Sequence, residues 1–275
     1  MSSHLKIEHV YKTFPAKKVK GEITADFVAV DDISIQVKAG EFLVIVGPSG
    51  CGKSTLLDLL AGLTTPSRGE ITIDGKTITG PGLDRGIVFQ QYALFPWLTA
   101  LQNIEFGLEA KGIAKAERRQ TAQHFLQLVG LTDFGQHYPS ELSGGMKQRV
   151  AIARSLAYNP DVLLMDEPFA ALDAQTRETL QSELLRIWQQ TGKTVIFITH
   201  SIDEAIYLGQ RIAIMTSRPG RIKTVIDVPE SLKNQQEDVR SNQEFGQLRH
   251  HIWTLLREEV DKAQALEKHS QLAVA

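Results

Sequence analysis

Residues 47–54 read GPSGCGKS, a glycine-rich segment of the kind that binds phosphate. The segment fits the pattern G-x-x-x-x-G-K-S/T, follows the apolar run FLVIV and precedes the helical run STLLDLLAG. Its glycines allow backbone N–H groups to point at a triphosphate from the N-terminus of a helix. Lys53 is expected to neutralise the β- and γ-phosphate oxygens, and the Ser54 hydroxyl to ligate Mg²⁺. The alternative is a glycine-rich turn that arose by chance.

The predicted nucleotide-binding residues of this segment are Gly47, Pro48, Ser49, Gly50, Cys51, Gly52, Lys53, Ser54 and Thr55. Cys51 is the only cysteine of the chain, so an internal disulfide is excluded. Phosphate binding does not need its side chain, and we interpret it as a tolerated small residue in preference to a redox thiol. The polar start MSSHLK lacks the apolar core of a secretory signal, which favours a reducing cytoplasm.

Two adjacent carboxylates, Asp166 and Glu167, end the apolar run VLLMD. Neighbouring side chains on a strand point in opposite directions, which allows the two groups different tasks. Asp166 is suited to the magnesium shell beside Ser54. Glu167 is suited to orient and deprotonate a water for in-line attack on the γ-phosphorus. An ordinary strand terminus is the alternative.

His200 ends a second apolar run, VIFITH. The carboxyl ends of parallel strands share one edge of a sheet, so His200 is expected near Asp166, as a candidate contact for the γ-phosphate. A lone histidine is more often structural, and the catalytic interpretation depends on the other motifs. His250 and His251 have no ligand spacing around them and are expected to face solvent.

Four short apolar runs, rich in β-branched residues, have the character of strands buried on both faces, which indicates a parallel sheet. They span residues 42–46, 162–165, 195–199 and 212–215. Residues 5–10 and 33–37 alternate apolar and polar side chains, as in a half-exposed antiparallel sheet. Residues from about 92 to 160 have mainly helical patterns. The elements predict an α/β core with an inserted helical lobe.

The bulk composition narrows the function classes. The chain has 275 residues, 42% of them apolar and 23% charged, with a formal net charge of −2. This balance gives no electrostatic footprint for nucleic acid, so nucleic acid is not an expected partner. No stretch approaches the ~18 consecutive apolar residues that span a bilayer, so any membrane role must come through a partner.

Residues 142–149 read LSGGMKQR. Together with GPSGCGKS, VLLMDEP, AALD at residues 170–173 and TH at residues 199–200, this segment resembles ATP-binding cassette (ABC) ATPases across nearly the whole chain. The resemblance implies ATP and Mg²⁺ as cofactors. It implies a P-loop NTPase fold of ABC-cassette type: a mixed sheet core, an N-terminal antiparallel β subdomain and an inserted α-helical subdomain. Residues 1–229 would form the cassette, with the helical lobe at about 92–160.

The family's signature segment completes the nucleotide site of an opposite subunit, which implies two ATP molecules sandwiched in a head-to-tail dimer. The matching residues here are Leu142, Ser143, Gly144, Gly145 and Met146. Ser143 and Gly145 can offer hydrogen-bond donors to a γ-phosphate at the start of a helix. Met146 stands where the commonest signature has Gln, and we expect activity to survive because the Ser-Gly-Gly backbone is intact.

Three further residues take their roles from the resemblance. Gln90 matches the Q-loop, which contacts magnesium and the attacking water and links to the membrane subunit; the alternative is an ordinary polar residue. Phe14 lies where an aromatic ring stacks on adenine, with Tyr11 as the competing candidate. Asp173 matches the D-loop, which crosses the dimer interface; the alternative is a helix cap.

The segments KTITGPGLDRGIVFQ, LFPWLTALQNIEFGL and SRPGRI look like importer ATPases that serve nitrate, taurine and other sulfonates. The subgroup implies transmembrane permease subunits, a second cassette of the same or a related kind, and an extracytoplasmic solute-binding protein acting through the complex. It places the chain at the cytoplasmic face of the inner membrane. The sequence does not choose the solute, because other subunits hold that selectivity.

The alternative function is that of a soluble ABC-type ATPase that acts on ribosomes or nucleic acid. Such proteins are expected to carry two cassettes, a long coiled-coil insertion or a basic surface, and the sequence has none of these. A small-molecule kinase built on the same phosphate loop does not explain the signature segment.

Residues 230–275 are expected to form a linker and a C-terminal amphipathic helix, because Phe245, Leu248, Ile252 and Leu255 recur at helical spacing. That helix could pack on the cassette, meet the tail of a partner or make a regulatory contact. Packing on the cassette is the favoured interpretation.

Overall fold

The computed structural model describes residues 3–16, 18–19, 22–23, 26–233 and 239–272. The chain divides into two compact units. Unit 1 comprises Met1–Ser3, Ala39–Glu41 and Pro81–Ile196, and unit 2 comprises His4–Lys38, Phe42–Gly80 and Phe197–Ala275. Strand β10 (Thr194–Thr199) begins in unit 1 and ends in unit 2.

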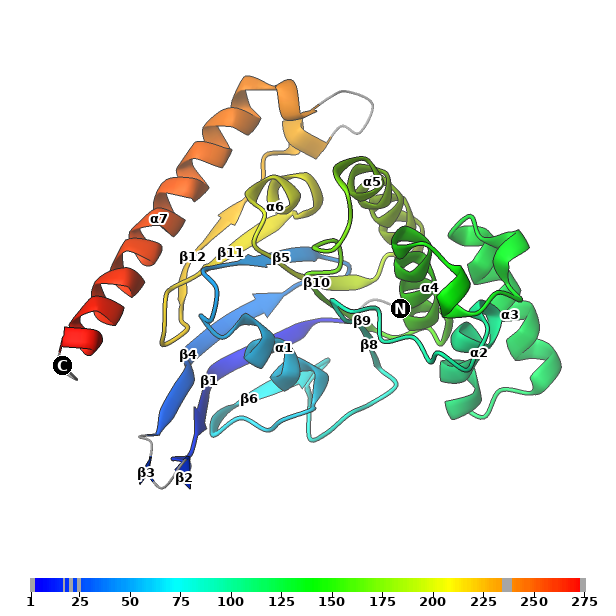
Figure 1. The fold of residues 1–275 in the computed structure, drawn as a ribbon, viewed down its shortest axis with the longest axis horizontal. Helices are drawn as coiled ribbons and strands as arrows, with labels where there is room; N and C mark the ends of the chain where they lie inside the picture. Colours follow the sequence, from blue (N-terminus) through cyan, green and yellow to red (C-terminus); the bar gives the residue numbers. More distant parts are fainter. Residues whose placement is uncertain (1–2, 17, 20–21, 24–25, 234–238, 273–275) are drawn as a thin grey trace. The chain divides into compact units, whose positions relative to one another are not determined.

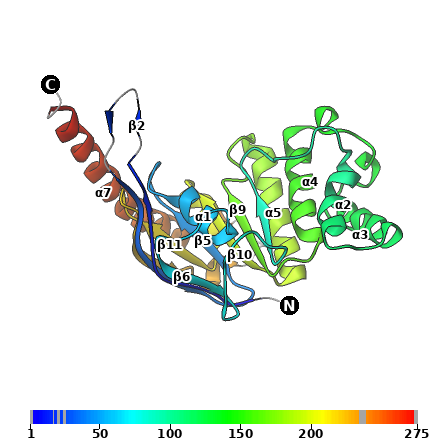
Figure 2. The same cartoon turned by 90° about the horizontal axis from the view of Figure 1, so that it is seen from below.

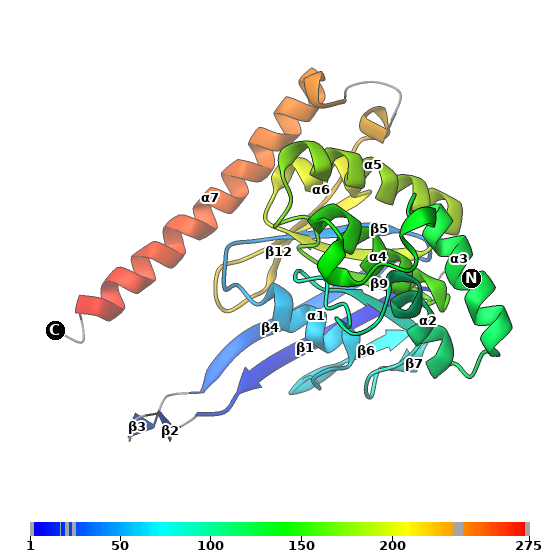
Figure 3. The same ribbon diagram turned by 45° about the vertical axis from the view of Figure 1, so that its right-hand side comes forward.

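Unit 2 contains an antiparallel sheet with one buried face. The strand order is β4 (Phe27–Val37), β1 (Leu5–Phe14), β6 (Arg68–Ile73) and β7 (Lys76–Thr77). Strand β1 lies between β4 and β6 (Figures 1 and 3). Leu5 of β1 pairs with Val37 of β4 and with Ile73 of β6. Ile33, Ile35 and Val37 are buried while the residues between them are exposed. This alternation agrees with the half-exposed antiparallel sheet that the sequence predicts.

Unit 2 also holds buried strands that precede the functional segments. Strand β5 (Phe42–Val46) is buried at every position and pairs in parallel with β11 (Arg211–Met215). Strand β11 pairs on its other side, antiparallel, with β12 (Ile222–Asp227). An all-apolar β5 suits a strand covered on both faces. It delivers the chain directly to residues 47–54.

The helices of unit 2 are α1 (Lys53–Ala61), α6 (Ile202–Leu208) and α7 (Gln243–Leu272), with short elements β2 (Lys18–Val19), β3 (Glu22–Ile23), η3 (Glu230–Lys233) and η4 (Val239–Ser241). Helix α7 contacts α6, η4 and β11. Phe245 and Ile252 are buried on its inward stripe, which is the expected source of stability for an amphipathic surface helix.

Unit 1 combines a parallel strand pair with helices. Strand β8 (Arg85–Val88) pairs in parallel with β9 (Val162–Asp166). The helices are α2 (Ala100–Ala110), α3 (Lys115–Leu128), η1 (Thr132–Phe134), η2 (Pro139–Glu141), α4 (Gly144–Ala157) and α5 (Ala174–Thr191). Helices α2, α3 and α4 pack on one another (Figure 2). Over the described part of the chain, no helix has the length and apolar character needed to cross a membrane.

Candidate functional site

The glycines of residues 47–54, the phosphate loop, are required by its geometry. Gly50 and Gly52 have φ angles of +72° and +101°, which side chains rarely allow. A Cβ atom on Gly52 would lie 2.5 Å from the Ala29 carbonyl oxygen. Gly52 is also the N-cap of α1 and supplies no side-chain cap to its first turn. First-turn N–H groups lack helical partners, so this end of α1 is suited to an anion.

Gly52→Ala is expected to lower the free energy of unfolding by about 2–4 kcal/mol, because the methyl group overlaps backbone in addition to straining φ. Chemical denaturation measures this change. Gly75→Ala is the matched control, since Gly75 has φ +75° and a Cβ placed on it would have no neighbour within 4 Å. A cost at Gly52 no larger than the control's ~1 kcal/mol would contradict the steric argument.

The ammonium group of Lys53 lies within the phosphate loop. Its side chain is buried, and Nζ donates to the carbonyl oxygens of Gly47 and Pro48, at 2.9 Å each. Cys51 Sγ is 4.0 Å from the same nitrogen. Burial raises the pKa of the Cys51 thiol, although the charge of Lys53 acts in the opposite direction. A buried thiol of this kind is unreactive, which agrees with the interpretation of Cys51 as a tolerated small residue.

Phe14 lies at the end of β1 opposite Phe27 of β4. The two rings are stacked with centroids 6.2 Å apart and an interplanar angle of 23°. Tyr11 instead lies opposite Arg68 of β6. Phe14 therefore belongs to an aromatic pair at the end of the sheet, whereas Tyr11 does not.

A contact that the sequence analysis missed joins the phosphate loop to the segment after β11. Arg218 Nη2 donates to the Gly50 carbonyl oxygen at 3.3 Å, and its guanidinium lies 4.5 Å from the Phe27 ring centroid. Arg218 thus connects the phosphate loop with the Phe14–Phe27 pair. The only signal in the sequence was the segment SRPGRI, which carried a family resemblance and no spatial information.

His200 follows the last residue of β10, at the start of α6 in unit 2. The turn is fixed by Thr199, whose Oγ1 donates to Glu204 Oε2 at 2.5 Å and accepts from Ser201 N at 3.0 Å. His200 is exposed and lines a groove together with Asp203 of α6 and residues of α7. His250 and His251 are exposed, as expected.

Asp166 and Glu167 lie in unit 1, where Asp166 is the last residue of β9. Glu167 has φ +43°, an uncommon value for a residue with a side chain. Strained backbone of this kind concentrates at functional sites, and no sequence pattern indicated it. The phosphate loop and His200 belong to unit 2, so their predicted proximity to these carboxylates stays a prediction.

The signature segment forms the start of α4. Ser143 is exposed and is the N-cap residue, with Oγ accepting from Met146 N at 3.3 Å. A Cβ on Gly145 would lie 2.7 Å from Thr176 Cγ2 of α5, so the glycine allows α4 and α5 to approach closely. Leu142 is buried, and Gly144 and Met146 are half-buried.

Gln90 is exposed just beyond β8, before a turn in which Tyr92 and Ala93 have positive φ. Arg154 of α4 holds this turn, donating to the carbonyl oxygens of Ala93 at 2.6 Å and Tyr92 at 3.1 Å. Its guanidinium also lies 5.8 Å from the Phe95 ring centroid. Sequence reasoning did not identify Arg154, which lies 61 positions from Ala93.

Asp173 caps α5, because its side chain accepts from Thr176 N at 3.0 Å. This backbone hydrogen bond lowers the pKa of Asp173. The capping alternative is therefore present in the structure, and a role across a dimer interface stays a prediction.

Sequence comparison identifies close relatives over nearly the whole chain. The family model described as "ABC transporter" matches residues 30–170. An uncharacterized ABC transporter ATP-binding protein of Methanocaldococcus jannaschii is 51% identical over 265 residues, 96% of this chain and 95% of that protein. The nitrate import ATP-binding protein NrtD of Synechocystis sp. is 47% identical over 269 residues, 96% and 99% of the two chains. The taurine import ATP-binding protein TauB of Roseobacter denitrificans is 48% identical over 231 residues, 83% and 86%.

A solved structure supports the fold. The dimeric post-hydrolysis state of the ATP-binding cassette MJ0796 bound to ADP and Pi superposes with a TM-score of 0.70 at 37% identity. The match covers 82% of this chain and 99% of that one. The predicted fold class, an antiparallel N-terminal sheet with a mixed core sheet and helices, is confirmed by this likeness.

Proposed function

The chain belongs to the ABC transporter family as an ATP-hydrolysing, ATP-binding subunit, and from this premise we propose that it energises the import of a small anion such as nitrate, taurine or another sulfonate. The proposal is supported mainly by two importer subunits whose sequences match this chain over most of its length. A nitrate importer subunit and a taurine importer subunit each match most of the chain at nearly half identity. This similarity to importer subunits favours a cassette that works in a membrane transport complex over an ATPase that acts on ribosomes or nucleic acid.

In this proposal the phosphate loop holds the triphosphate. Lys53 and the first-turn N–H groups of α1 bind the phosphate oxygens. The Phe14 ring stacks on adenine, supported from behind by Phe27. The remaining loop contacts come from Gly47, Pro48, Ser49, Gly50, Cys51, Gly52, Ser54 and Thr55.

The hydrolytic step belongs to the side chains after β8, β9 and β10. Glu167 accepts a proton from water as the water attacks the γ-phosphorus and the bond to the β-γ bridging oxygen breaks. His200 contacts the γ-phosphate, and Gln90 orients the water.

The side chains proposed as metal ligands are chemically of the kinds that bind a magnesium nucleotide. The described residues hold no cluster of three His, Cys, Asp or Glu side chains able to bind a metal alone. Mg²⁺ is usually held by one or two carboxylates and the substrate's phosphates, and Asp166, Ser54 and Gln90 supply suitable oxygens. When bound, Mg²⁺ would neutralise charge on the phosphates.

A second cassette completes each site in the proposed dimer. Ser143, Gly144 and Gly145 would face the γ-phosphate bound by the partner, with Leu142 and Met146 flanking them and Asp173 crossing the interface. Support comes from the exposure of Ser143 at the start of a 14-residue helix, and from the dimeric state of the structural relative.

The permease would dock on an aromatic surface of unit 1 formed by Phe95, Trp97 and Phe106, a few residues beyond Gln90 in the chain and on α2. Trp97 is 70% exposed and Phe106 is 46% exposed. Both rings contact Phe95, with centroid separations of 5.6 Å and 4.5 Å. Exposed aromatic clusters commonly mark interaction surfaces. In this proposal an extracytoplasmic solute-binding protein would act from the other side of the membrane, and this chain would lie at the cytoplasmic face.

Trp97→Ser is expected to reduce co-purification with the permease from detergent-solubilised membranes at least about tenfold, because truncating an aromatic anchor costs ~2 kcal/mol or more. Affinity for ATP should remain unchanged. Trp253→Ser, at an exposed tryptophan of α7 in unit 2, is the matched control. Equal recovery of both variants with the permease would count against this surface.

Substrate and cellular role are tested by deletion of the coding sequence followed by uptake of labelled nitrate and taurine. We expect the uptake of at least one anion to fall and to be restored by the natural chain. If the tagged protein were recovered only with ribosomes or DNA, and the deletion strain took up both anions normally, the alternative function of a soluble ABC-type ATPase would be supported instead.

A further inference from the structure

Helix α7 carries a buried carboxylate where its pattern calls for an apolar side chain. The inward stripe repeats every seventh residue at Phe245, Ile252 and Glu259, which are 3%, 0% and 2% exposed. Burying a carboxylate is costly unless it is well paired. A simple packing helix would continue with an apolar residue, so Glu259 calls for a specific partner.

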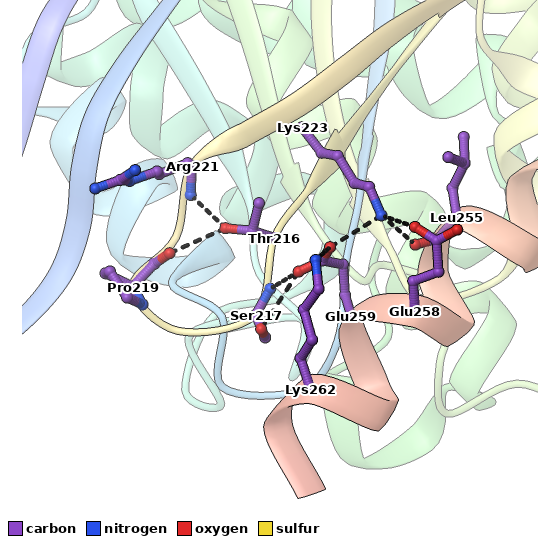
Figure 4. Close-up of polar contacts among 9 residues, drawn as sticks. All are labelled: Thr216, Ser217, Pro219, Arg221, Lys223, Leu255, Glu258, Glu259 and Lys262. Atoms are coloured by element: carbon purple, nitrogen blue, oxygen red, sulfur yellow. Dashed lines mark hydrogen bonds and ion pairs between the residues drawn. The ribbon is translucent and has the colours of Figure 1, made fainter. Parts of the chain in front are cut away.

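The partner is the segment between β11 and β12 (Figure 4). Glu259 Oε2 accepts from the backbone N and the Oγ of Ser217, at 3.1 Å and 3.3 Å. Glu259 Oε1 lies 2.9 Å from Nζ of Lys223 and 2.9 Å from Nζ of Lys262. Burial acts to raise the pKa of Glu259, but these hydrogen bonds and charges outweigh it and lower the pKa to about 2. Glu259 is therefore ionised at physiological pH and accepts two hydrogen bonds from Ser217.

Residues 216–221, the SRPG loop, are closed by Thr216. Its Oγ1 accepts from Arg221 N at 3.0 Å and donates to the Pro219 carbonyl oxygen at 2.9 Å. These bonds span both ends of the loop, and Figure 4 shows Ser217 held by Glu259 beside them. Because Thr216 connects the two ends of the loop by hydrogen bonds, a displacement of Ser217 is expected to displace the whole loop.

Other residues of the SRPG loop contact the phosphate loop and the strand β4 beside it. Arg218 donates to the Gly50 carbonyl oxygen and lies over Phe27. Gly220 N donates to the Ala29 carbonyl oxygen at 3.1 Å. A Cβ on Gly220 would lie 2.1 Å from the Cys51 carbonyl oxygen, so the two loops touch through their backbones.

We propose that Glu259 is a positioning residue for the nucleotide site, acting through Ser217 and Arg218 on the phosphate loop and on the Phe14–Phe27 pair. The inference rests on the proposed role of the phosphate loop in binding ATP. Helix α7 thereby contributes to nucleotide affinity through the SRPG loop, without supplying any of the proposed nucleotide-binding residues. Because coupling between sites is reciprocal, a bound nucleotide must also stabilise the docking of α7 by the same factor.

The test compares Glu259→Met with Glu258→Met in the full chain. Methionine at position 259 keeps the inward stripe filled and apolar, which preserves packing, and removes the acceptor for Ser217. Glu258 also pairs with Lys223 but is 54% exposed. Calorimetric titration with MgADP, which is not hydrolysed, should give a Kd about fivefold or more higher for Glu259→Met. The control should bind within about twofold of the natural chain.

Arg218→Gln tests the route. If Glu259 acts through the SRPG loop, the double variant Glu259→Met/Arg218→Gln should bind MgADP no more weakly than the weaker single variant, because coupled residues are not additive. Fully additive losses would overturn the proposed route.

Amide hydrogen exchange on the natural chain gives a measurement that needs no variant. Saturating MgADP should slow exchange in residues 255–262 and 216–221. Unchanged exchange there, or an unchanged Kd for Glu259→Met, would reduce Glu259 to a structural anchor and overturn the proposal. If the natural chain does not bind MgADP at all, the nucleotide-binding role itself fails, which is a different outcome.

Discussion

Glu167→Gln is expected to lower kcat for ATP hydrolysis by about 100-fold or more while leaving the affinity for MgATP within about threefold of the natural chain. Glutamine has nearly the same shape but cannot accept the proton that the attacking water must lose. The positive φ of Glu167 supports this assignment, because a strained backbone conformation is maintained here at a cost of ~1–3 kcal/mol. With hydrolysis blocked, ATP should remain bound between two cassettes and hold them together.

Three measurements on purified protein check this result: steady-state phosphate release, equilibrium binding of MgATP, and mass by light scattering with and without MgATP. We expect a nucleotide-dependent dimer for the variant. Glu178→Gln is the matched control, since Glu178 lies on the exposed side of α5 in the same unit. A Glu167→Gln variant that hydrolyses ATP at the natural rate as a monomer would contradict both the base and the dimeric site.

Lys53→Ala is expected to raise the Kd for MgATP about 10- to 150-fold, because hydrogen bonds to charged groups contribute ~1.5–3 kcal/mol. The structure sharpens this expectation. Lys53 Nζ is buried and is held by the carbonyl oxygens of Gly47 and Pro48, so its charge is confined to the loop. No other side chain of the phosphate loop carries a positive charge.

Calorimetric titration with MgATP under non-hydrolysing conditions, in the Glu167→Gln background, measures the affinity. Lys76→Ala removes an exposed lysine of unit 2 and should bind ATP normally. Loss of Lys53 also removes one donor from each of the Gly47 and Pro48 carbonyl oxygens, so the unfolding midpoint of the nucleotide-free protein must be followed in parallel. An unaltered Kd in a folded Lys53→Ala protein would remove Lys53 from the site.

Several elements could be predicted from the sequence because they depend on residues that are close together in the chain. The all-apolar run of β5, the glycines and lysine of the phosphate loop, and the alternating pattern of β4 each depend on residues close together in the chain. Asp173 was recognisable as a helix cap for the same reason, since a cap and its helix are neighbours. The α/β class followed from the apolar strand runs and the helical patterns between them, whereas the cassette type came from the resemblance to ABC ATPases.

The contacts that connect such elements were not readable. Arg218 and Gly50 are separated by 168 positions, and Ser217 and Glu259 by 42, so no local period joins them. The helical pattern of the tail predicted a stripe of Phe245, Leu248, Ile252 and Leu255. Phe245 and Ile252 are buried, Leu248 and Leu255 are only half-buried, and the buried stripe also includes Glu259. The reason is physical: spacing indicates which residues share a helix face, but only packing decides how deeply each of them is buried and whether a charged residue on that face meets a partner.

The sequence by itself was sufficient to predict the phosphate-binding and hydrolytic residues of this ATPase, because such chemistry requires particular side chains in short segments. Tertiary structure alone decided how the tail helix is joined to that chemistry. The connection depends on the buried Glu259 carboxylate, which binds Ser217 in a loop that lies beside the phosphate loop. Residues so far apart in the chain show no spacing pattern from which such a contact could be predicted.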